Sequence, residues 1–448
     1  MVEKIIEDGS RFSFNIQVFK DLMTISLSCE SNVFEGNQLI KLFAGQLPKT
    51  IIINTCAVTT RYVRIVKEYI HRLKKYYPDY TIYLTGCGSN FYPDEYKDLG
   101  IIIPDKDKFL PQSYGLTSVN SDDMIYTTPK IGIQTGCSHH CAYCVTRLVK
   151  GKSTSRDYAS IYKNIQEVIA VGWNKIILAG VDLTEYYSDG MYLSDLCRRI
   201  LKDFPDICIQ TNNLDPAAPE TLKMAQLVKE EPKRMIQMLH LPVQSGSNKI
   251  LAAMRRRHKV EDLEKIYDLI KDTTITTTWD IIVGFPGETE EDFQATCDII
   301  KKYKPTSSLV LPCCLHKGTE AYEMNNKVPL DIAEQRMNIA RALVDENSFE
   351  FNSTLNIKFT EDTLPYKLAY LSNRETALEH KKVILDFTDF EIFDLDIITL
   401  VDNLLYCNLI NSLEIIFSDR TNKKFITKFI KTLKNNNVMD EKVRLVNE

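Results

Sequence analysis

The stretch Ile131–Arg156, IGIQTGCSHHCAYCVTRLVKGKSTSR, decides how the rest of the chain is interpreted. Cys137, Cys141 and Cys144 follow one another at C-x3-C-x2-C spacing, directly after a short apolar run that predicts a strand. Cysteine thiolates are the usual ligands of iron–sulfur clusters, so this spacing predicts three ligands of a cubane [4Fe–4S] cluster. No fourth cysteine lies nearby, and we therefore expect one iron to be open to a substrate or cofactor.

The alternatives for these cysteines are a zinc site or a group of buried free thiols, although zinc sites more often use paired C-x2-C knuckles and a fourth ligand. The spacing resembles the signature of the radical S-adenosylmethionine (SAM) enzymes. That resemblance implies that SAM chelates the open iron through its amine and carboxylate. One electron from the cluster then cleaves SAM to methionine and a 5′-deoxyadenosyl radical. It also implies that Tyr143 contacts the adenine of SAM.

The composition limits the class of protein. A chain of 448 residues is too long for one compact core and predicts two to three domains. The net charge of −5 argues against indiscriminate phosphate binding, so nucleic acid would be bound by local basic patches. Twelve cysteines without a secretory leader indicate metal ligands in a reducing compartment. No apolar run reaches the length of a membrane span, and we expect a cytoplasmic protein that contacts no membrane.

The first part of the chain predicts an α/β fold. After an amino-terminal extension (1–22), residues 23–104 alternate short apolar runs with helical stretches, which predicts an open parallel α/β domain. Three of these strands end on a cysteine: Cys29, Cys56 and Cys87. The carboxyl ends of parallel strands meet at one edge of a sheet, and a helix N-terminus favours a thiolate. The pattern therefore predicts a second three-cysteine site, unless each cysteine is simply a small buried hydrophobic residue.

The remaining chain divides into three parts. Residues 105–129 are polar and contain prolines, which predicts a linker. From 130 to 355, six apolar runs alternate with helical patterns, which predicts a partial (β/α)6 barrel with its chemistry at the carboxyl ends of the strands. Residues 356–448 contain no glycine and predict a small carboxyl-terminal domain of uncertain fold.

With both cysteine sets placed, the chain resembles the radical SAM methylthiotransferases, which insert sulfur and then methyl into a tRNA base or a ribosomal protein. SLSCESNVFEGNQL, INTCAVTTRYV and LTGCGS match the family's three amino-terminal cysteine motifs, and ILAGVDL, LHLPVQSGSNKILAAMRRRH and DIIVGFPGET match motifs of its barrel. The resemblance implies that Cys29, Cys56 and Cys87 hold an auxiliary [4Fe–4S] cluster that carries or donates sulfur. The chain would thus use two [4Fe–4S] clusters, one of them coordinating SAM.

Other residues of these motifs are candidates for binding SAM. Gly180 ends a strand where the backbone would approach the cofactor, and Gly284 opens a tight turn into a helix. Gln244, with Ser245 and Ser247, follows another strand and could hydrogen-bond SAM or the target, although turn or capping roles are equally open. The family context favours phosphate contacts for a set of basic residues: Arg147, Lys150, Lys152, Arg156, Arg255, Arg256, Arg257, His258 and Lys259.

The chain also departs from the family. Arg147 stands where proline is usual, and CCLHKGT replaces a motif with a tyrosine–serine pair and an arginine. The glycine-free tail is not clearly the family's RNA-binding β-barrel, the TRAM domain.

The resemblance predicts a tRNA methylthiotransferase that acts on C2 of adenosine 37, in the anticodon loop. Asn54–Thr59 reads NTCAVT, which is similar to the branch that modifies N6-threonylcarbamoyladenosine. The alternatives are action on isopentenyladenosine 37 or on a ribosomal-protein aspartate, and a family member that binds tRNA without catalysis. An electron donor and a sulfur source are also required, and the sequence identifies neither.

Overall fold

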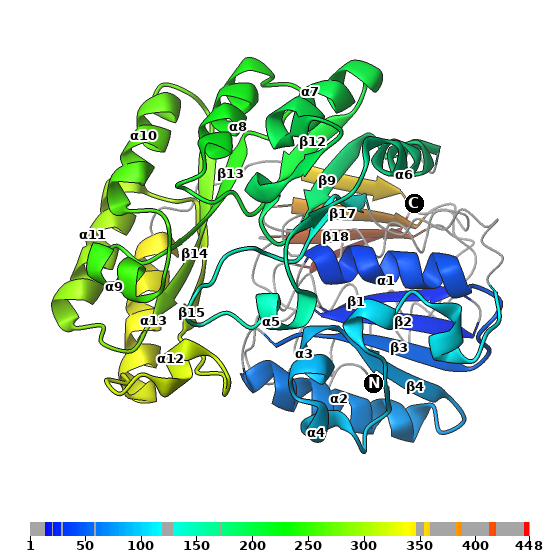
Figure 1. Cartoon of the computed structure of the whole chain (residues 1–448). Helices are drawn as coiled ribbons and strands as arrows, with labels where there is room; N and C mark the ends of the chain where they lie inside the picture. Colours follow the sequence, from blue (N-terminus) through cyan, green and yellow to red (C-terminus); the bar gives the residue numbers. More distant parts are fainter. Residues whose placement is uncertain are drawn as a thin grey trace.

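The structure is a computed structural model, which describes residues 14–19, 21–27, 30–57, 60–118, 129–170, 173–345, 354–358, 382–387, 412–417 and 443–447. An amino-terminal sheet with its helices lies beside a larger layer of parallel strands and outer helices (Figure 1). The predicted α/β fold class is confirmed.

The amino-terminal sheet has five strands in sequence order: β1 (Phe14–Phe19), β2 (Leu22–Leu27), β3 (Thr50–Thr55), β4 (Thr81–Thr85) and β5 (Ile101–Ile102). Strands β2 to β5 are parallel, as expected, whereas β1 lies within the predicted extension and pairs antiparallel with β2. Every residue of β3 is buried, because helices cover both faces of this central strand.

Two helices cover opposite faces of this sheet (Figure 1). Ile51 and Ile53 pack with the residues of α2 (Thr60–Tyr76), whereas Ile52 packs with those of α1 (Glu30–Phe43). The alternation follows from the two-residue period of a strand. Two short helices, α3 (Gly86–Phe91) and α4 (Pro93–Tyr96), follow β4. Residues 105–118, the described part of the predicted linker, form two 3-10 turns, and Tyr114 packs between Phe43 and Tyr83.

The second layer contains the six predicted parallel strands: β6 (Lys130–Gly132), β9 (Lys175–Ala179), β12 (Cys208–Thr211), β13 (Met238–Gln244), β14 (Thr276–Val283) and β15 (Ser307–Pro312). They pair as two three-stranded sheets, and a parallel bridge between Ile209 and Met235 connects the sheets. Between the first and last strand no pairing closes the ring among the described residues, so the arrangement is the expected partial barrel.

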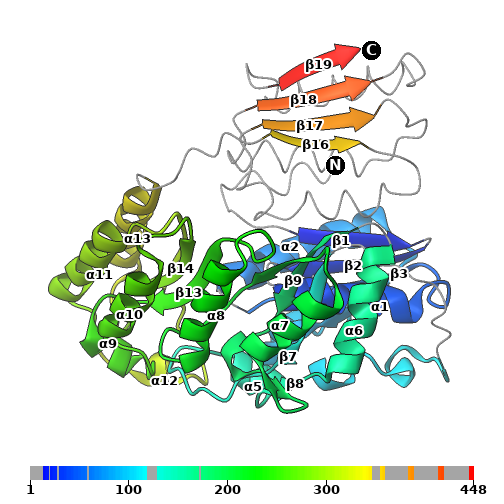
Figure 2. The same ribbon diagram turned by 90° about the horizontal axis from the view of Figure 1, so that it is seen from above.

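Helices lie on the outside of these strands (Figures 1 and 2): α6 (Tyr158–Ala170), α7 (Leu193–Asp203), α8 (Pro219–Glu230), α9 (Asn248–Ala253), α10 (Val260–Ile270), α11 (Glu290–Tyr303) and α13 (Leu330–Asp345). Shorter elements lie between them: β7 (Gln134–Thr135), α5 (Thr146–Lys150), β8 (Thr154–Ser155), β10 (Tyr187–Ser188), β11 (Met191–Tyr192) and α12 (Glu320–Glu323).

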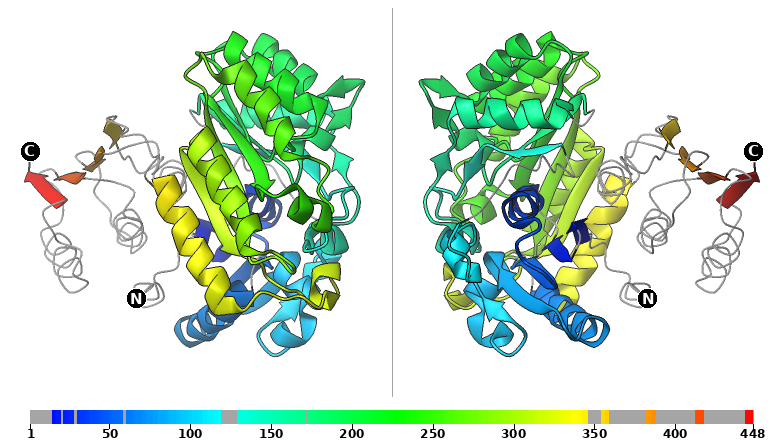
Figure 3. Two further views of the ribbon diagram at one scale, coloured as in Figure 1. Left: turned by 90° about the vertical axis from the view of Figure 1, so that its left-hand side faces the viewer. Right: turned by 90° about the vertical axis from the view of Figure 1, so that its right-hand side faces the viewer.

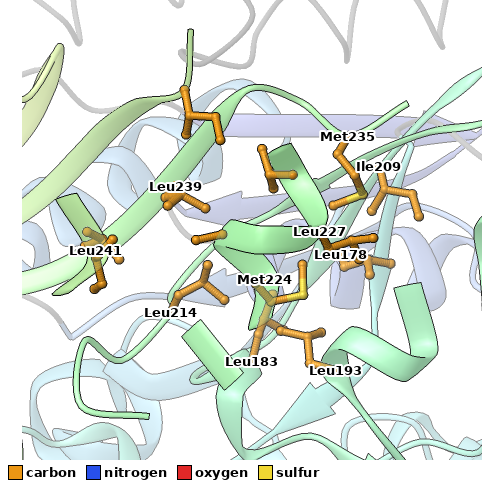
Figure 4. Packing of buried hydrophobic residues seen from close by; sticks show 14 of the residues in the cluster. Leu178, Leu183, Leu193, Ile209, Leu214, Met224, Leu227, Met235, Leu239 and Leu241 are labelled. Carbon is orange, nitrogen blue, oxygen red and sulfur yellow. The ribbon is translucent and has the colours of Figure 1, made fainter. Parts of the chain in front are cut away.

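Apolar side chains between strands and helices form the core of the barrel. Leu178 of β9 and Ile209 of β12 lie beside Met224 and Leu227 of α8, with Leu239 of the next strand close by (Figure 4). Burial of such side chains stabilises by about 1.5–3 kcal/mol each. This core holds the strands rigidly, so the loops at their carboxyl ends start from fixed positions.

The carboxyl-terminal strands are β16 (Thr354–Lys358), β17 (Lys382–Phe387), β18 (Ser412–Phe417) and β19 (Val443–Asn447). They form a separate sheet in sequence order, and all neighbours are parallel (Figures 2 and 3). RNA-binding β-barrels of the OB type are antiparallel, so these four strands belong to a different architecture. In the described parts of the chain, no helix has the length and hydrophobicity needed to cross a bilayer.

Candidate active site

The C-x3-C-x2-C loop is closed at its base by backbone contacts. The Cys137 N–H donates to the Gly151 carbonyl at 3.1 Å, beside the paired strands β7 and β8. Gly136 has a φ of 70°, and a Cβ there would lie 2.2 Å from the carbonyl oxygen of Lys152. Only glycine fits this close approach. At the other end, the Ala142 N–H donates to the Met254 carbonyl at 3.0 Å, which ties the loop to the segment after α9.

The three thiols share one partly buried environment. Burial, with the nearby charges of Glu185, Asp182 and Cys144, raises the pKa of Cys137 to about 12. Burial also raises the pKa of Cys141. Thiols in such surroundings stay protonated unless a cation replaces the protons. Three soft donors on one loop therefore fit an iron–sulfur cluster.

A group of charged residues surrounds the loop. The Arg256 side chain is buried, with Nη1 3.5 Å from Cys141 Sγ and Nη2 3.5 Å from Asp215 Oδ2. Arg257 is half-exposed, and its Nη2 lies 2.7 Å from His139 Nε2. The His139 ring nitrogen also lies 2.9 Å from Asp182 Oδ2.

These charged residues help to decide whether the site would hold zinc or an iron–sulfur cluster. In the described residues, Cys137, His139 and Glu185 offer ligand atoms within 4.8 Å of one another. The guanidinium of Arg257 beside the His139 ring opposes an additional cation there, so the arrangement favours a cluster on the three cysteines.

Three of the predicted SAM-binding residues lie at the carboxyl ends of barrel strands. Gly180 follows β9, and a Cβ there would lie 2.8 Å from Gln134 Oε1, so the missing side chain makes room for this glutamine. Gly284 follows β14 with a φ of 71°, and a Cβ there would lie 2.5 Å from that of Ala333. Gln244 ends β13 with a φ of 66°, and no described residue hydrogen-bonds its buried Oε1. Packing explains the glycines, whereas the Gln244 oxygen still lacks a partner.

Tyr143 lies between Cys141 and Cys144 in the cluster loop and packs against a small apolar group. Burial raises the pKa of its hydroxyl well above the usual value, so the ring stays neutral. This apolar group includes Met254, which follows α9, and Phe285, which lies in the loop after β14.

The two serines after Gln244 have structural partners. Ser247 is the N-cap of α9: its Oγ lies 3.4 Å from the Ile250 N–H and donates to Asp292 Oδ1 at 2.7 Å. Ser245 Oγ lies 3.4 Å from Thr296 Oγ1. The turn and capping interpretation therefore describes both serines.

The amino-terminal cysteines are described in part, because Cys29 lies outside the described residues. Cys56 follows β3 and is buried, and Cys87 is the second residue of α3, the helix that follows β4, and is half-buried. A parallel bridge between Thr55 and Gly86 continues the strand pairing up to these cysteines. A Cβ on Gly88 would lie 2.7 Å from the Cys56 carbonyl oxygen, so glycine allows α3 to approach this cysteine closely. Two soft donors from neighbouring strand ends fit part of a cluster site.

The structure changes the interpretation of several basic residues. The Lys150 side chain is 3% exposed and pairs with Glu35, and Arg156 donates to the Gly132 carbonyl and to Asn164. Arg256 and His258 are also inside the protein. Tertiary packing covers these four side chains, so the expected phosphate contacts do not apply to them. Lys152, Arg255, Arg257 and Lys259 remain exposed at the surface.

Sequence reasoning missed several residues of the site. Glu35 lies in the first cysteine motif and Asp215 lies just after β12, yet neither was singled out. The available signal for Glu35 is its place in the first cysteine motif, six residues after Cys29. Asn212, also after β12, is buried, and its amide has no partner among the described residues.

Comparison with known proteins adds to this geometry. A protein-family model described as the radical SAM superfamily matches residues 131–300. The chain is similar to the threonylcarbamoyladenosine tRNA methylthiotransferases of Rickettsia prowazekii, with 29% identity covering 71% of this chain and 81% of the relative, and of Bacillus subtilis, with 28% identity covering 73% and 81%. It is also similar to the tRNA-2-methylthio-N6-dimethylallyladenosine synthase of Caldicellulosiruptor saccharolyticus, with 28% identity covering 80% and 85%. Among solved structures, a radical SAM methyltransferase from Kitasatospora setae matches with 16% identity and a TM-score of 0.48, covering 68% of this chain and 69% of that one.

Proposed function

This chain is an enzyme of the radical SAM methylthiotransferase class, and from that premise we propose that it adds a methylthio group to C2 of N6-threonylcarbamoyladenosine at position 37 of tRNA. The observation that carries the proposal is the proximity of two cysteine sites. Helix α3, which contains Cys87, contacts α5, which follows Cys144. Methylthiolation needs a radical and a sulfur source at one substrate atom, and neighbouring cluster sites meet that need.

Each site has a separate task in this proposal. Cys137, Cys141 and Cys144 would hold the cluster that binds SAM, and Cys29, Cys56 and Cys87 would hold the auxiliary cluster. The bound cofactors would supply a 5′-deoxyadenosyl radical and the sulfur to be transferred, because the protein itself has no group for such chemistry. Arg256 holds Cys141 and Asp215 in place, and Tyr143 and its apolar neighbours exclude water from the loop.

We further propose that SAM and the base bind at the carboxyl ends of the barrel strands. The unpartnered Oε1 of Gln244 and the amide of Asn212 are hydrogen-bonding groups at the carboxyl ends of β13 and β12. A buried polar group without a partner costs about 1–3 kcal/mol, and a ligand hydroxyl or amine would remove that cost. Gly180 lets the end of β9 approach Gln134, and Gly284 lets the end of β14 approach Ala333 of α13. A loop base such as adenosine 37 can unstack and approach these strand ends.

The substrate branch rests on the NTCAVT motif at Cys56 and on relatives of the threonylcarbamoyl branch. The threonylcarbamoyl group carries a carboxylate, which a guanidinium can bind with two parallel hydrogen bonds. Isopentenyladenosine is the second candidate substrate, because relatives that act on the dimethylallyl base also match over most of the chain.

The test uses the full chain, reconstituted with iron and sulfide without oxygen. It is incubated with SAM, a reductant and one of two tRNAs, carrying threonylcarbamoyladenosine or isopentenyladenosine, and nucleosides are analysed by mass spectrometry. We expect a methylthio product only from the first tRNA. A product from the second tRNA alone would assign the enzyme to the other branch.

The cysteine sites are tested in the same assay. Replacement of Cys137, Cys141 and Cys144 by alanine should abolish 5′-deoxyadenosine formation and about half of the bound iron. Replacement of Cys29, Cys56 and Cys87 should remove the other half and the methylthio product, while 5′-deoxyadenosine still forms. If that second variant makes full product with added sulfide, the amino-terminal cysteines have no part in sulfur delivery.

A further inference from the structure

Four charged side chains form a buried group between the amino-terminal sheet and the barrel. Glu35 contacts Lys150 Nζ through Oε1 at 2.6 Å and Lys108 Nζ through Oε2 at 2.7 Å. Asp105 contacts Lys108 at 2.8 Å and lies 3.7 Å from Lys150. All four side chains are at most 12% exposed. We call these residues the interdomain charge cluster.

The cluster is tied to the segments of two amino-terminal cysteines. Asn54 donates through Nδ2 to Glu35 Oε2 at 2.8 Å and to the Asn32 carbonyl at 3.2 Å. Asn54 lies two residues before Cys56, and Asn32 lies three residues after Cys29 along the chain. One buried amide therefore links the end of β3, the start of α1 and the carboxylate of Glu35.

The third amino-terminal segment and the barrel loop reach the same cluster. Asn90 of α3, the helix that contains Cys87, accepts a hydrogen bond from the Asp105 N–H at 2.9 Å. Lys150 is the last residue of α5, the helix that follows Cys144, and α5 contacts α3. Lys150 thus connects the radical SAM cysteine loop to the surroundings of all three amino-terminal cysteines.

The charges in this cluster are fixed. Although burial lowers the pKa of Lys150, the negative charges of Glu35, Cys87 and Asp105 raise it well above the usual value. Burial raises the pKa of Glu35, but Lys108 and Lys150 bring it down to about 2. A buried charge that loses its partner costs about 3–5 kcal/mol, so the loop cannot shift along the sheet without breaking these pairs.

We propose that Lys150 is a positioning residue for sulfur transfer: held by Glu35, its ammonium fixes the radical SAM cysteine loop at one distance and orientation from the sheet edge that carries Cys56 and Cys87. The inference rests on the proposed function, because only a reaction that uses both sites needs their separation fixed. Reacting groups must approach within about 3–3.5 Å, and a displacement of about 1 Å can reduce the rate about 100-fold.

The experiment compares two full-length variants, each of which breaks one ion pair between α1 and the barrel. Lys150→Met breaks the pair with Glu35. Lys41→Met is the matched control, because Lys41 of α1 pairs with Glu167 of α6 at 2.5 Å and both side chains are largely buried. Each reconstituted protein is assayed for iron, 5′-deoxyadenosine and methylthiolated tRNA. The magnetic interaction between the two reduced clusters is measured by electron paramagnetic resonance.

For Lys150→Met we expect unchanged iron and 5′-deoxyadenosine within about twofold of the unmodified protein, but methylthiolated tRNA reduced about 100-fold. The magnetic interaction should change, because the separation of the clusters is no longer fixed. Lys41→Met should match the unmodified protein in every measurement. Lys150→Arg keeps the charge and should restore at least a tenth of the product.

Equal losses of 5′-deoxyadenosine and product in Lys150→Met, with an unchanged magnetic interaction, would overturn the inference. If Lys150→Met does not fold, Glu35→Gln combined with Lys150→Met removes both charges and should show the same separation of the two activities. If the unmodified protein makes no methylthiolated tRNA, the proposed function fails. A magnetic interaction altered by Lys150→Met and not by Lys41→Met would still support the positioning role.

Discussion

A buried histidine behind the cysteine loop gives the protein a pH-dependent stability. His258 is 1% exposed, and its Nε2 donates to the Val243 carbonyl at 2.9 Å. Burial and the positive charge of Arg256 lower the pKa of His258 from 6.5 to about 4. Between these values the unfolded chain binds a proton that the folded protein does not, so the free energy of unfolding falls as the pH falls.

Because of His258 alone, the free energy of unfolding should be about 2 kcal/mol lower at pH 5 than at pH 7. We predict that His258→Gln, which keeps an N–H donor but cannot titrate, loses less stability between pH 7 and pH 5 than the unmodified protein. His71→Gln, at an exposed position of α2, should behave like the unmodified protein. Urea unfolding at both pH values measures the differences, and equal losses in all three proteins would contradict the prediction.

The sequence predicted the roles of some single residues and not of others. The spacing of the cysteines predicts cluster ligands, because a cluster needs these atoms whatever surrounds them, and this assignment stays a prediction. The roles of Lys150 and Arg256 did not follow, because a basic side chain beside a motif can face phosphate, a carboxylate or a thiol. Only the tertiary structure, which puts Glu35 against Lys150 and Asp215 against Arg256, decides between these partners.

At the scale of elements, the cysteine loop depends on one glycine. Gly136 precedes Cys137 with a φ of 70°, and a Cβ there would lie 2.2 Å from the Lys152 carbonyl oxygen. Gly190, in the turn between β10 and β11, has a φ of 75° and open space around a Cβ. The two positions share a left-handed conformation, which costs a residue with a side chain roughly 1–2 kcal/mol, and differ in the available space.

We predict that Gly136→Ala moves the loop and lowers the iron bound after reconstitution by about half, because the radical SAM site is lost and the amino-terminal site is kept. Gly190→Ala should bind iron like the unmodified protein and lose only about 1 kcal/mol of stability. Iron analysis and thermal unfolding distinguish these outcomes. A full iron content in Gly136→Ala would show that the loop tolerates the displacement.

Most elements of the two layers were predicted, because their strands are apolar runs between helical patterns. β3 and β9 are examples, since buried parallel strands leave a continuous apolar signal. β1 was missed, because FNIQVF lies in a segment taken for an extension and becomes an edge strand only by pairing with β2. The parallel sheet of β16 to β19 was not predicted, because the glycine-free sequence from 356 to 448 suggested only a small domain of uncertain fold.

At the scale of the whole molecule, the two layers form one unit. Helix α1 contacts β2 of the amino-terminal sheet and β6 of the barrel, and the Lys41–Glu167 pair joins α1 to α6. The backbone of the cysteine loop is also tied to the end of the barrel, where the Ala321 N–H donates to the Ala142 carbonyl at 2.8 Å. The described cysteines of the two predicted cluster sites therefore depend on contacts within residues 14–345.

The carboxyl-terminal part should then be dispensable for radical formation. Residues 356–448 contain 13 Lys and Arg and 15 Asp and Glu, a net charge of −2, and the described strands form a sheet unlike an antiparallel RNA-binding barrel. Nucleic-acid affinity comes largely from Lys and Arg that neutralise phosphates and release counterions.

We predict that a chain ending at Asp345 keeps both clusters and 5′-deoxyadenosine formation. It should bind tRNA within about tenfold of the full chain, with the same dependence of log Kd on log salt concentration. Iron analysis, SAM cleavage and filter binding at several salt concentrations test this, and a much shallower salt dependence in the shortened chain would place phosphate contacts in the carboxyl-terminal part.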